Sequence, residues 1–121
     1  MLREQRDMAS FCDMLDAARA AVEFTKDVQF DAFLKNRLVR NAVERNLEII
    51  GEAAGRISQQ TRDRYPDIPW QSIIGLRNIL IHEYHEIRYE KLWLVCQYRL
   101  PLLIEMLEKM GVVQPPPGGK S

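Results

Sequence analysis

Residues 75–86, GLRNILIHEYHE, place side chains that can do chemistry inside an otherwise apolar helical pattern. The stretch holds an arginine, an asparagine, a tyrosine and both of the chain's histidines. On an α-helix Asn78 and His82 are four positions apart and share a face, so the asparagine amide can orient the imidazole. Arg77 and His82 are five positions apart, about 140° around the helix axis. A helix that ends near His82, or a second protomer facing the first, would bring these two side chains to one site.

Histidine together with arginine suits the cleavage of a phosphodiester bond. A neutral imidazole can take a proton from a ribose 2′-hydroxyl, because imidazole titrates near neutral pH. A guanidinium can hold phosphate through two hydrogen bonds and stabilise the charge that develops in the transition state. The product would be a 2′,3′-cyclic phosphate, and the reaction would need no metal ion. His82 is therefore a candidate general acid–base catalyst, and Arg77 a candidate phosphate ligand.

The same residues permit other interpretations. His82 and His85 flank Glu83, but the zinc-binding His-Glu-x-x-His motif needs histidines four positions apart, and these are three apart. We therefore expect no metal site. The chain has no nucleophile in a recognisable turn context and no glycine-rich phosphate loop. Arg77 and His82 could also serve only as cations at a helix C-terminus, and on spacing alone this structural role is slightly the better explanation.

The elements that must hold this segment are predicted to be helices. Apolar residues at alternating spacings of three and four predict amphipathic helices over residues 3–25 and 37–59. Between them, residues 31–36 predict a short helical turn that is capped by Asp31. Gly51 lies inside the second long helix, where glycine is unfavourable, and so predicts a close approach of another helix.

The second half of the chain continues the helical pattern. Pro69 suits the first turn of a third helix, which carries the candidate site. A last helix is predicted from about Arg88 to Gly111, with a kink at Pro101 because proline has no N–H to donate. No strand pattern competes with these helices. The predicted fold class is therefore all-α, a bundle of four to five helices.

The composition is that of one ordinary globular domain. Of the 121 residues, 46% are hydrophobic and 28% are charged. We assign residues 1–112 to the helical domain and the Pro/Gly-rich residues 113–121 to a disordered tail. No apolar run approaches the roughly 20 residues that a membrane span needs, and the charged N-terminus is not typical of a signal peptide. Cys12 and Cys96 are interpreted as buried thiols in a reducing cytoplasm, where we expect the protein to be found.

The charge balance gives no strong indication of a polyanionic partner. The net charge is zero, although residues 32–66 hold seven basic and four acidic side chains. This basic segment could face phosphates, but a solvated helix face is the expected default. Amphipathic helices in a chain this small leave apolar surface uncovered, so pairing with a second copy is an open expectation.

The motif and its surroundings together resemble a known family. RNILIHEY, residues 77–84, resembles the Arg-x4-His-x-Tyr motif of the HepT-like family, within the HEPN superfamily of all-helical domains. NLEIIGEA (46–53) and YPDIPW (65–70) stand in the family's order before it, and the resemblance covers roughly residues 3–110. It implies a HEPN-type bundle and a homodimer whose motif helices face a shared cleft.

The resemblance also implies a function. It is that of the toxin in a type VII-like toxin–antitoxin module, a metal-independent endoribonuclease without a cofactor that cleaves RNA by 2′-hydroxyl attack. Carried over, Arg77 and His82 become the catalytic pair and Asn78 a polar support beside them. The implied partner is a minimal nucleotidyltransferase antitoxin of the MntA type, which silences such toxins by transferring AMP from ATP to the motif tyrosine, here Tyr84. The added phosphates would block the cleft and repel RNA.

A function of another class remains open. The chain could be a non-catalytic dimeric module that binds a nucleotide or a protein, with the polar segment contacting the nucleotidyltransferase. The zero net charge keeps this alternative open. His85 and Glu86 are assigned no role, and the tyrosines outside the motif are expected to serve packing: Tyr65, Tyr89 and Tyr98.

Overall fold

The computed structural model describes residues 2–113, and its regular structure in that range is entirely helical. In chain order the elements are α1 (Arg3–Thr25), α2 (Phe30–Lys35), α3 (Arg37–Arg56), α4 (Gln59–Arg64), α5 (Trp70–Ile74), α6 (Leu76–His82), α7 (His85–Leu94), the π-helical turn η1 (Val95–Arg99) and α8 (Leu100–Lys109). The all-α prediction is confirmed. Apart from Val113, the predicted tail lies outside the described residues. No helix of the described part is long and apolar enough to cross a membrane.

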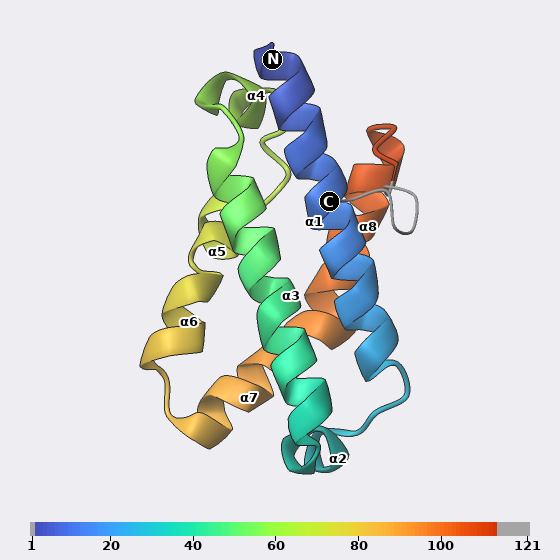
Figure 1. Ribbon diagram of the computed structural model, residues 1–121, viewed down its shortest axis with the longest axis vertical. Coiled ribbons are helices and arrows are strands. Elements are labelled where there is room, and N and C mark those ends of the chain that lie inside the picture. Colours follow the sequence, from blue (N-terminus) through green and yellow to red (C-terminus); the bar gives the residue numbers. More distant parts are fainter. Residues whose placement is uncertain (1, 114–121) are drawn as a thin grey trace.

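The two longest helices, α1 and α3, pack against each other at the centre of the bundle. They run antiparallel, with α5 and α6 along one side of α3 and α8 beside α1 (Figure 1). One apolar core joins them, and its largest fully buried side chains are Phe33, Met14, Leu15, Leu47, Ile50, Ile57, Leu92 and Leu107. Full burial of each such side chain contributes about 1.5–3 kcal/mol, so this core supplies the main favourable term in folding.

Two glycines set where the candidate motif helix lies. A Cβ at Gly51 of α3 would stand 3.3 Å from the carbonyl oxygen of Ile73 in α5, which confirms the predicted close approach. A Cβ at Gly75 would stand 2.9 Å from the carbonyl oxygen of Gln71, closer than real side chains allow. Gly75 is therefore the residue at which the chain can bend from α5 into α6, and both helices then lie against α3.

The predicted cap of the short second helix is wrong by two positions. Gln29 is the N-cap of α2, and Asp31 lies inside the first turn, where its Oδ1 accepts a hydrogen bond of 3.0 Å from the Ala32 N–H. The helix begins at Phe30, whose ring packs against Trp93 with 5.9 Å between ring centroids. This contact across 63 positions of chain is not visible in the local pattern that nominated Asp31.

The second long helix ends earlier than predicted, at Arg56, because a new cap starts α4. Ser58 is the N-cap of α4, and its Oγ accepts a hydrogen bond of 3.3 Å from the Thr61 N–H. The carboxylate of Asp7, from α1, is buried beside this cap. It accepts hydrogen bonds from the Ser58 N–H (3.0 Å), the Ser58 Oγ (2.7 Å) and the Thr61 Oγ1 (2.6 Å). Burial alone would raise the pKa of Asp7, but the hydrogen bonds from Thr61 and Ser58 outweigh it and lower that pKa.

The last helix begins at His85 rather than Arg88, and its predicted kink takes the form of a π-helical turn. In η1 the Leu100 N–H bonds to the carbonyl of Val95, five residues earlier. This wider turn comes directly before Pro101, which has no N–H for the regular ladder. In Figure 1, α7 passes behind α3, and the chain then turns upward into α8.

The two cysteines are free thiols, as interpreted from the sequence. Cys96 is buried, and burial raises its pKa to about 12. Cys12 is half-buried.

Candidate active site

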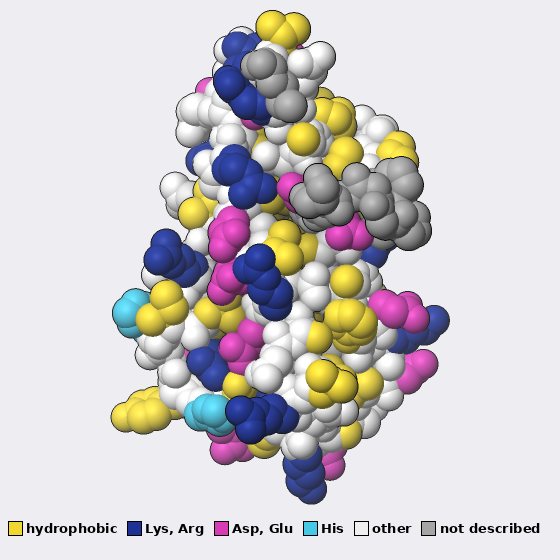
Figure 2. All heavy atoms as spheres, in the orientation of Figure 1, with side chains coloured by type: hydrophobic (Ala, Val, Ile, Leu, Met, Phe, Trp, Pro, Cys, Tyr) yellow, Lys and Arg dark blue, Asp and Glu magenta, His cyan; other side chains and the backbone are white. Residues whose placement is uncertain are grey.

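Helix α6 presents the predicted polar residues on its outer side. Leu76 is buried, and Ile79 and Leu80 pack against the core, so that side of the helix is apolar. The polar residues of the motif are all exposed: Arg77, Asn78 and His82. Figure 2 shows both of the chain's histidines at the surface of one face. The apolar side of α6 therefore anchors the helix, and the polar side is open to a ligand.

The helix ends at His82, which is one of the two arrangements expected to ease the five-residue spacing from Arg77. Glu83 leaves the helix with an extended backbone, φ −85° and ψ 154°. Tyr84 follows as the N-cap of α7 and is 82% exposed. The phenol is therefore accessible two residues after His82, at the turn between α6 and α7.

Within residues 2–113, the side chains of Arg77, Asn78 and His82 make no hydrogen bond or ion pair. The Asn78 amide does not orient the His82 imidazole in a single chain, so its supporting role stays a prediction. The Asn78 backbone N–H bonds to the Gly75 carbonyl at 2.9 Å as part of the first turn. The structure thus puts these side chains on one short helix without joining them to each other.

The position of Arg77 bears on the purely structural interpretation. His82 is in the last turn of α6, where a cation is favourable beside the helix dipole. Arg77 is in the first turn, where the same dipole disfavours a cation. A helix-end role therefore accounts for His82 but leaves Arg77 unexplained.

Most basic side chains of residues 32–66 are exposed, in agreement with the default interpretation of a solvated helix face. Four of its arginines contact protein groups: Arg40 donates to the Leu34 carbonyl at 2.6 Å, Arg45 pairs with Glu48, Arg56 pairs with Asp13 at 3.3 Å, and Arg62 donates to carbonyls at the end of α3. These side chains stabilise helices and their contacts. Arg77 makes no such contact among the described residues, and neither do Lys35, Arg37 and Arg64 of the segment.

The second histidine of the motif packs against a tyrosine. The His85 ring meets the Tyr89 ring edge-on, with 4.7 Å between centroids. Tyr89 is buried, and burial first, then its hydrogen bond to Glu44, raises its pKa. No group of three or more potential metal ligands exists within residues 2–113.

The packing expectation for the other tyrosines holds in part. Tyr65 packs edge-on against Phe11, with 6.0 Å between ring centroids. Tyr98 is 65% exposed on η1, so its predicted packing role is wrong for a single chain. The local pattern could not separate Tyr98 from a core residue, because the π-helical turn changes which side of the helix it occupies.

Sequence reasoning missed Arg88. Its Nη1 donates a hydrogen bond of 2.8 Å to the carbonyl oxygen of Leu80, in the last turn of α6. The predicted last helix started at Arg88, which gave this residue no partner. Because α7 starts three residues earlier, Arg88 instead lies within α7 and reaches back to α6. A contact across a turn leaves no periodic signal in the sequence.

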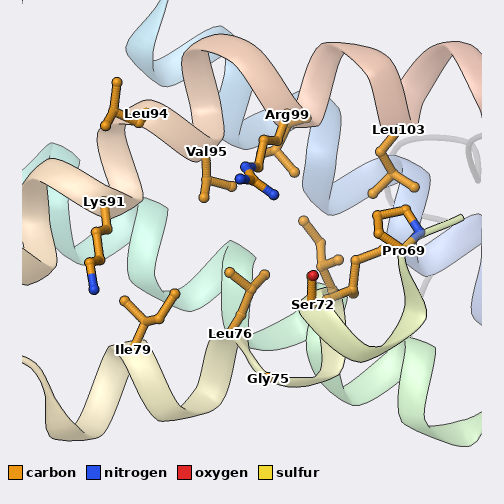
Figure 3. Close-up of a pocket in the computed structure, with 13 residues that line it drawn as sticks. Pro69, Ser72, Gly75, Leu76, Ile79, Lys91, Leu94, Val95, Arg99 and Leu103 are labelled. Carbon is orange, nitrogen blue, oxygen red and sulfur yellow. The ribbon is translucent and has the colours of Figure 1, made fainter.

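An apolar groove of about 490 Å³ lies beside α6. Figure 3 shows Lys91, Val95 and Arg99 on one wall, and Ser72, Leu76 and Ile79 on the other. None of the predicted site residues lines it. A shallower hollow of about 360 Å³ lies between α3 and the second half of α6, and Leu80 and Ile81 form part of its lining.

Comparisons with known proteins agree with the resemblance. Residues 14–110 match the protein family described as "Ribonuclease HepT-like". A Methanocaldococcus jannaschii protein named "Putative RNase MJ1380" is 42% identical over 105 residues, which cover 86% of this chain and 96% of that protein. A Thermococcus cleftensis protein named "Probable ribonuclease HepT" is 34% identical over 110 residues, covering 91% of this chain and 98% of that protein. The search of solved structures found no significant match. The chain therefore belongs to the HepT-like ribonuclease family.

Proposed function

We propose that this protein is a ribonuclease that cleaves RNA without a metal ion, with His82 as the acid–base catalyst and Arg77 as the phosphate ligand. The observation that carries the proposal is the exposure of both side chains at opposite ends of α6, without hydrogen bonds or ion pairs to the rest of residues 2–113. Membership of a ribonuclease family supports the substrate class.

The proposed reaction needs only these groups and the RNA. The His82 imidazole takes the proton of a ribose 2′-hydroxyl, and the 2′-oxygen attacks the adjacent phosphorus. The bond from phosphorus to the 5′-oxygen of the next nucleotide breaks, and that oxygen takes back the proton from the His82 imidazolium. The products are a 2′,3′-cyclic phosphate end and a 5′-hydroxyl end. Arg77 holds the non-bridging phosphate oxygens and stabilises their charge in the transition state.

Two partners belong to the proposal. The first is a second copy of the chain, which would supply a second Arg77 and His82 to a shared cleft. Six of the exposed large apolar side chains lie between the last turn of α6 and the first turn of α8: Ile81, Tyr84, Ile87, Leu94, Tyr98 and Leu102. Such a concentration of exposed apolar groups is typical of an interaction surface. The second partner is a nucleotidyltransferase antitoxin, for which this chain would be the toxin. The antitoxin would silence the chain by transferring AMP to Tyr84, which is accessible at the turn after α6.

The test is RNA cleavage in excess EDTA by protein whose intact mass shows that it is unmodified. His82→Ala and Arg77→Ala are expected to lower cleavage by at least about 10²-fold, since acid–base help alone is worth 10²–10⁴-fold. His85→Ala is the matched control, because it removes the other histidine of the segment. Wild-type fragments should carry cyclic phosphates.

Each cleavage result is interpreted together with the helicity of the variant, measured by circular dichroism. Equal cleavage by wild type and His82→Ala, with both proteins helical by circular dichroism, would contradict the catalytic assignment. No cleavage by any of the proteins would favour the alternative, a non-catalytic module that binds the nucleotidyltransferase.

A further inference from the structure

The end of helix α6, at His82, lacks the backbone cap that the other helices have. A helix leaves its last carbonyl groups without partners, and a backbone N–H after the helix commonly binds one of them. Such a bond exists at the C-cap of every other described helix. At α6 the C-cap residue, Glu83, is extended and makes no such bond. Other contacts must therefore hold the last turn of α6, which carries His82.

Side chains of α7 take the place of the missing cap. Arg88 Nη1 donates to the Leu80 carbonyl at 2.8 Å, two residues before His82. A guanidinium there also interacts favourably with the negative end of the helix dipole. Lys91 Nζ also forms an ion pair of 2.7 Å with Glu83 Oε1, but Lys91 is exposed and Glu83 only half-buried, and solvent weakens such a pair. Arg88 is therefore the main contact at this helix end.

The Arg88 side chain is itself fixed from several sides. Its Nη2 lies 3.6 Å from Glu44 Oε1 on α3 and donates a hydrogen bond of 2.7 Å to the Tyr89 hydroxyl. Its guanidinium carbon stands 4.5 Å from the centre of the Tyr89 ring. The Arg88 side chain is only 18% exposed. One half-buried guanidinium thus ties the end of α6 to α3 and α7.

We infer that Arg88 is a positioning residue, whose hydrogen bond to the Leu80 carbonyl fixes the last turn of α6 and so the place of the His82 imidazole. The inference rests on the proposed catalytic role of His82. A helix of seven residues has few internal hydrogen bonds to resist fraying, and its exposed end here has no other strong contact. Acid–base catalysis depends on the geometry of the transferring groups, so a loose His82 would lose rate more than RNA affinity.

The experiment compares Arg88→Met with a matched control, Arg62→Met. Arg62 caps the end of α3 in the same way. Its guanidinium donates to the carbonyls of Ile57 at 3.0 Å and Gly55 at 3.1 Å. Both variants lose a guanidinium that caps a helix end and keep an apolar side chain of similar length. Arg62→Met is expected to loosen the end of α3 and leave α6 unchanged.

The variants are compared by hydrogen exchange and NMR, which report on α6 and His82, and by the kinetics of RNA cleavage. In Arg88→Met, amide hydrogen exchange in the last turn of α6 should rise at least about tenfold, and the His82 ring signals in NMR spectra should shift. The kcat for RNA should fall about 10- to 100-fold with KM nearly unchanged, the pattern of a misplaced catalytic group. Arg88→Lys should recover part of the kcat, because one ammonium can reach Leu80 or Glu44 but not form the planar fork to both.

Several outcomes would overturn the inference. Unchanged exchange in α6 and unchanged His82 signals in Arg88→Met would show that Arg88 does not hold the turn. A loss of kcat without these changes would point to direct contact between Arg88 and RNA, and an equal loss in Arg62→Met would point to general destabilisation. If the wild type does not cleave RNA, the proposed function fails, while exchange and NMR still decide whether Arg88 fixes His82.

Discussion

Tyr84 is the motif residue whose hydroxyl is most open to another enzyme. It lies at the turn between α6 and α7 with 82% of its surface exposed, so an enzyme could reach its hydroxyl without unfolding the bundle. A group attached there would stand two residues from His82. Attached AMP would bring negative charge to the surface that, on the proposed function, must receive RNA phosphates.

Tyr84→Phe tests this role. The variant is expected to cleave RNA at nearly the wild-type rate and to resist inactivation by the cognate nucleotidyltransferase with ATP, because it has no hydroxyl to modify. Tyr98→Phe is the matched control, since Tyr98 is the other largely exposed tyrosine and should leave the protein sensitive. Intact mass and residual cleavage after incubation report both effects. Inactivation of Tyr84→Phe would refute the tyrosine switch.

Between elements, the contact that joins α1 to α4 depends on one buried carboxylate. Asp7 accepts three hydrogen bonds from Ser58 and Thr61, and these lower its pKa despite burial. An unfolded aspartate has a pKa of about 3.9. Because the folded pKa is lower, the stabilisation from Asp7 is complete above that value and is lost as the pH falls through the folded pKa.

Asp7→Asn is expected to destabilise the bundle at neutral pH. The amide nitrogen cannot accept the bonds that one carboxylate oxygen accepts, so the free energy of unfolding should fall by about 1–3 kcal/mol. Urea unfolding at pH 7 and below pH 4 measures the effect, and the difference from wild type should shrink at the lower pH. Asp67→Asn, an exposed aspartate in the turn before α5, should change stability by less than about 0.5 kcal/mol. A pH-independent difference would contradict the assigned cause.

At the scale of the whole molecule, the bent rod α7–η1–α8 leaves a stripe of apolar side chains uncovered. Ile87, Leu94, Tyr98 and Leu102 are the exposed large apolar side chains along α7, η1 and α8. Leu94 also lines the apolar groove beside α6. The stripe therefore reaches the helix that carries Arg77 and His82, and we propose that a second copy covers it.

Charge substitutions in the stripe test the proposed dimer. Tyr98→Glu and Leu102→Glu together are expected to convert the protein to a monomer in sedimentation equilibrium and to lower RNA cleavage, because a buried unpaired charge opposes association. Both side chains are exposed in the single chain, so the fold should survive, which circular dichroism checks. Leu38→Glu, an exposed leucine of α3 outside the stripe, is the control. A variant that remains dimeric would move the interface elsewhere.

Several features could be predicted from the sequence because they depend on near neighbours. The spacing of apolar residues determined the all-α class and the extent of α1, and Gly51 indicated the close approach of α5 to α3. The motif gave the candidate residues Arg77, Asn78, His82 and Tyr84. Helical periodicity and short motifs are properties of consecutive residues, and they need no knowledge of the partner elements.

Other features were decided only by the tertiary structure. The capping of α4 depends on Asp7, 51 positions away from Ser58, and the start of α2 on a ring contact between Phe30 and Trp93. The exposure of Arg77 and His82 depends on which side of α6 meets the core. The bond from Arg88 to the Leu80 carbonyl forms only because α7 folds back beside α6. Helix ends compete with alternative hydrogen bonds of similar energy, and contacts distant in sequence settle that competition.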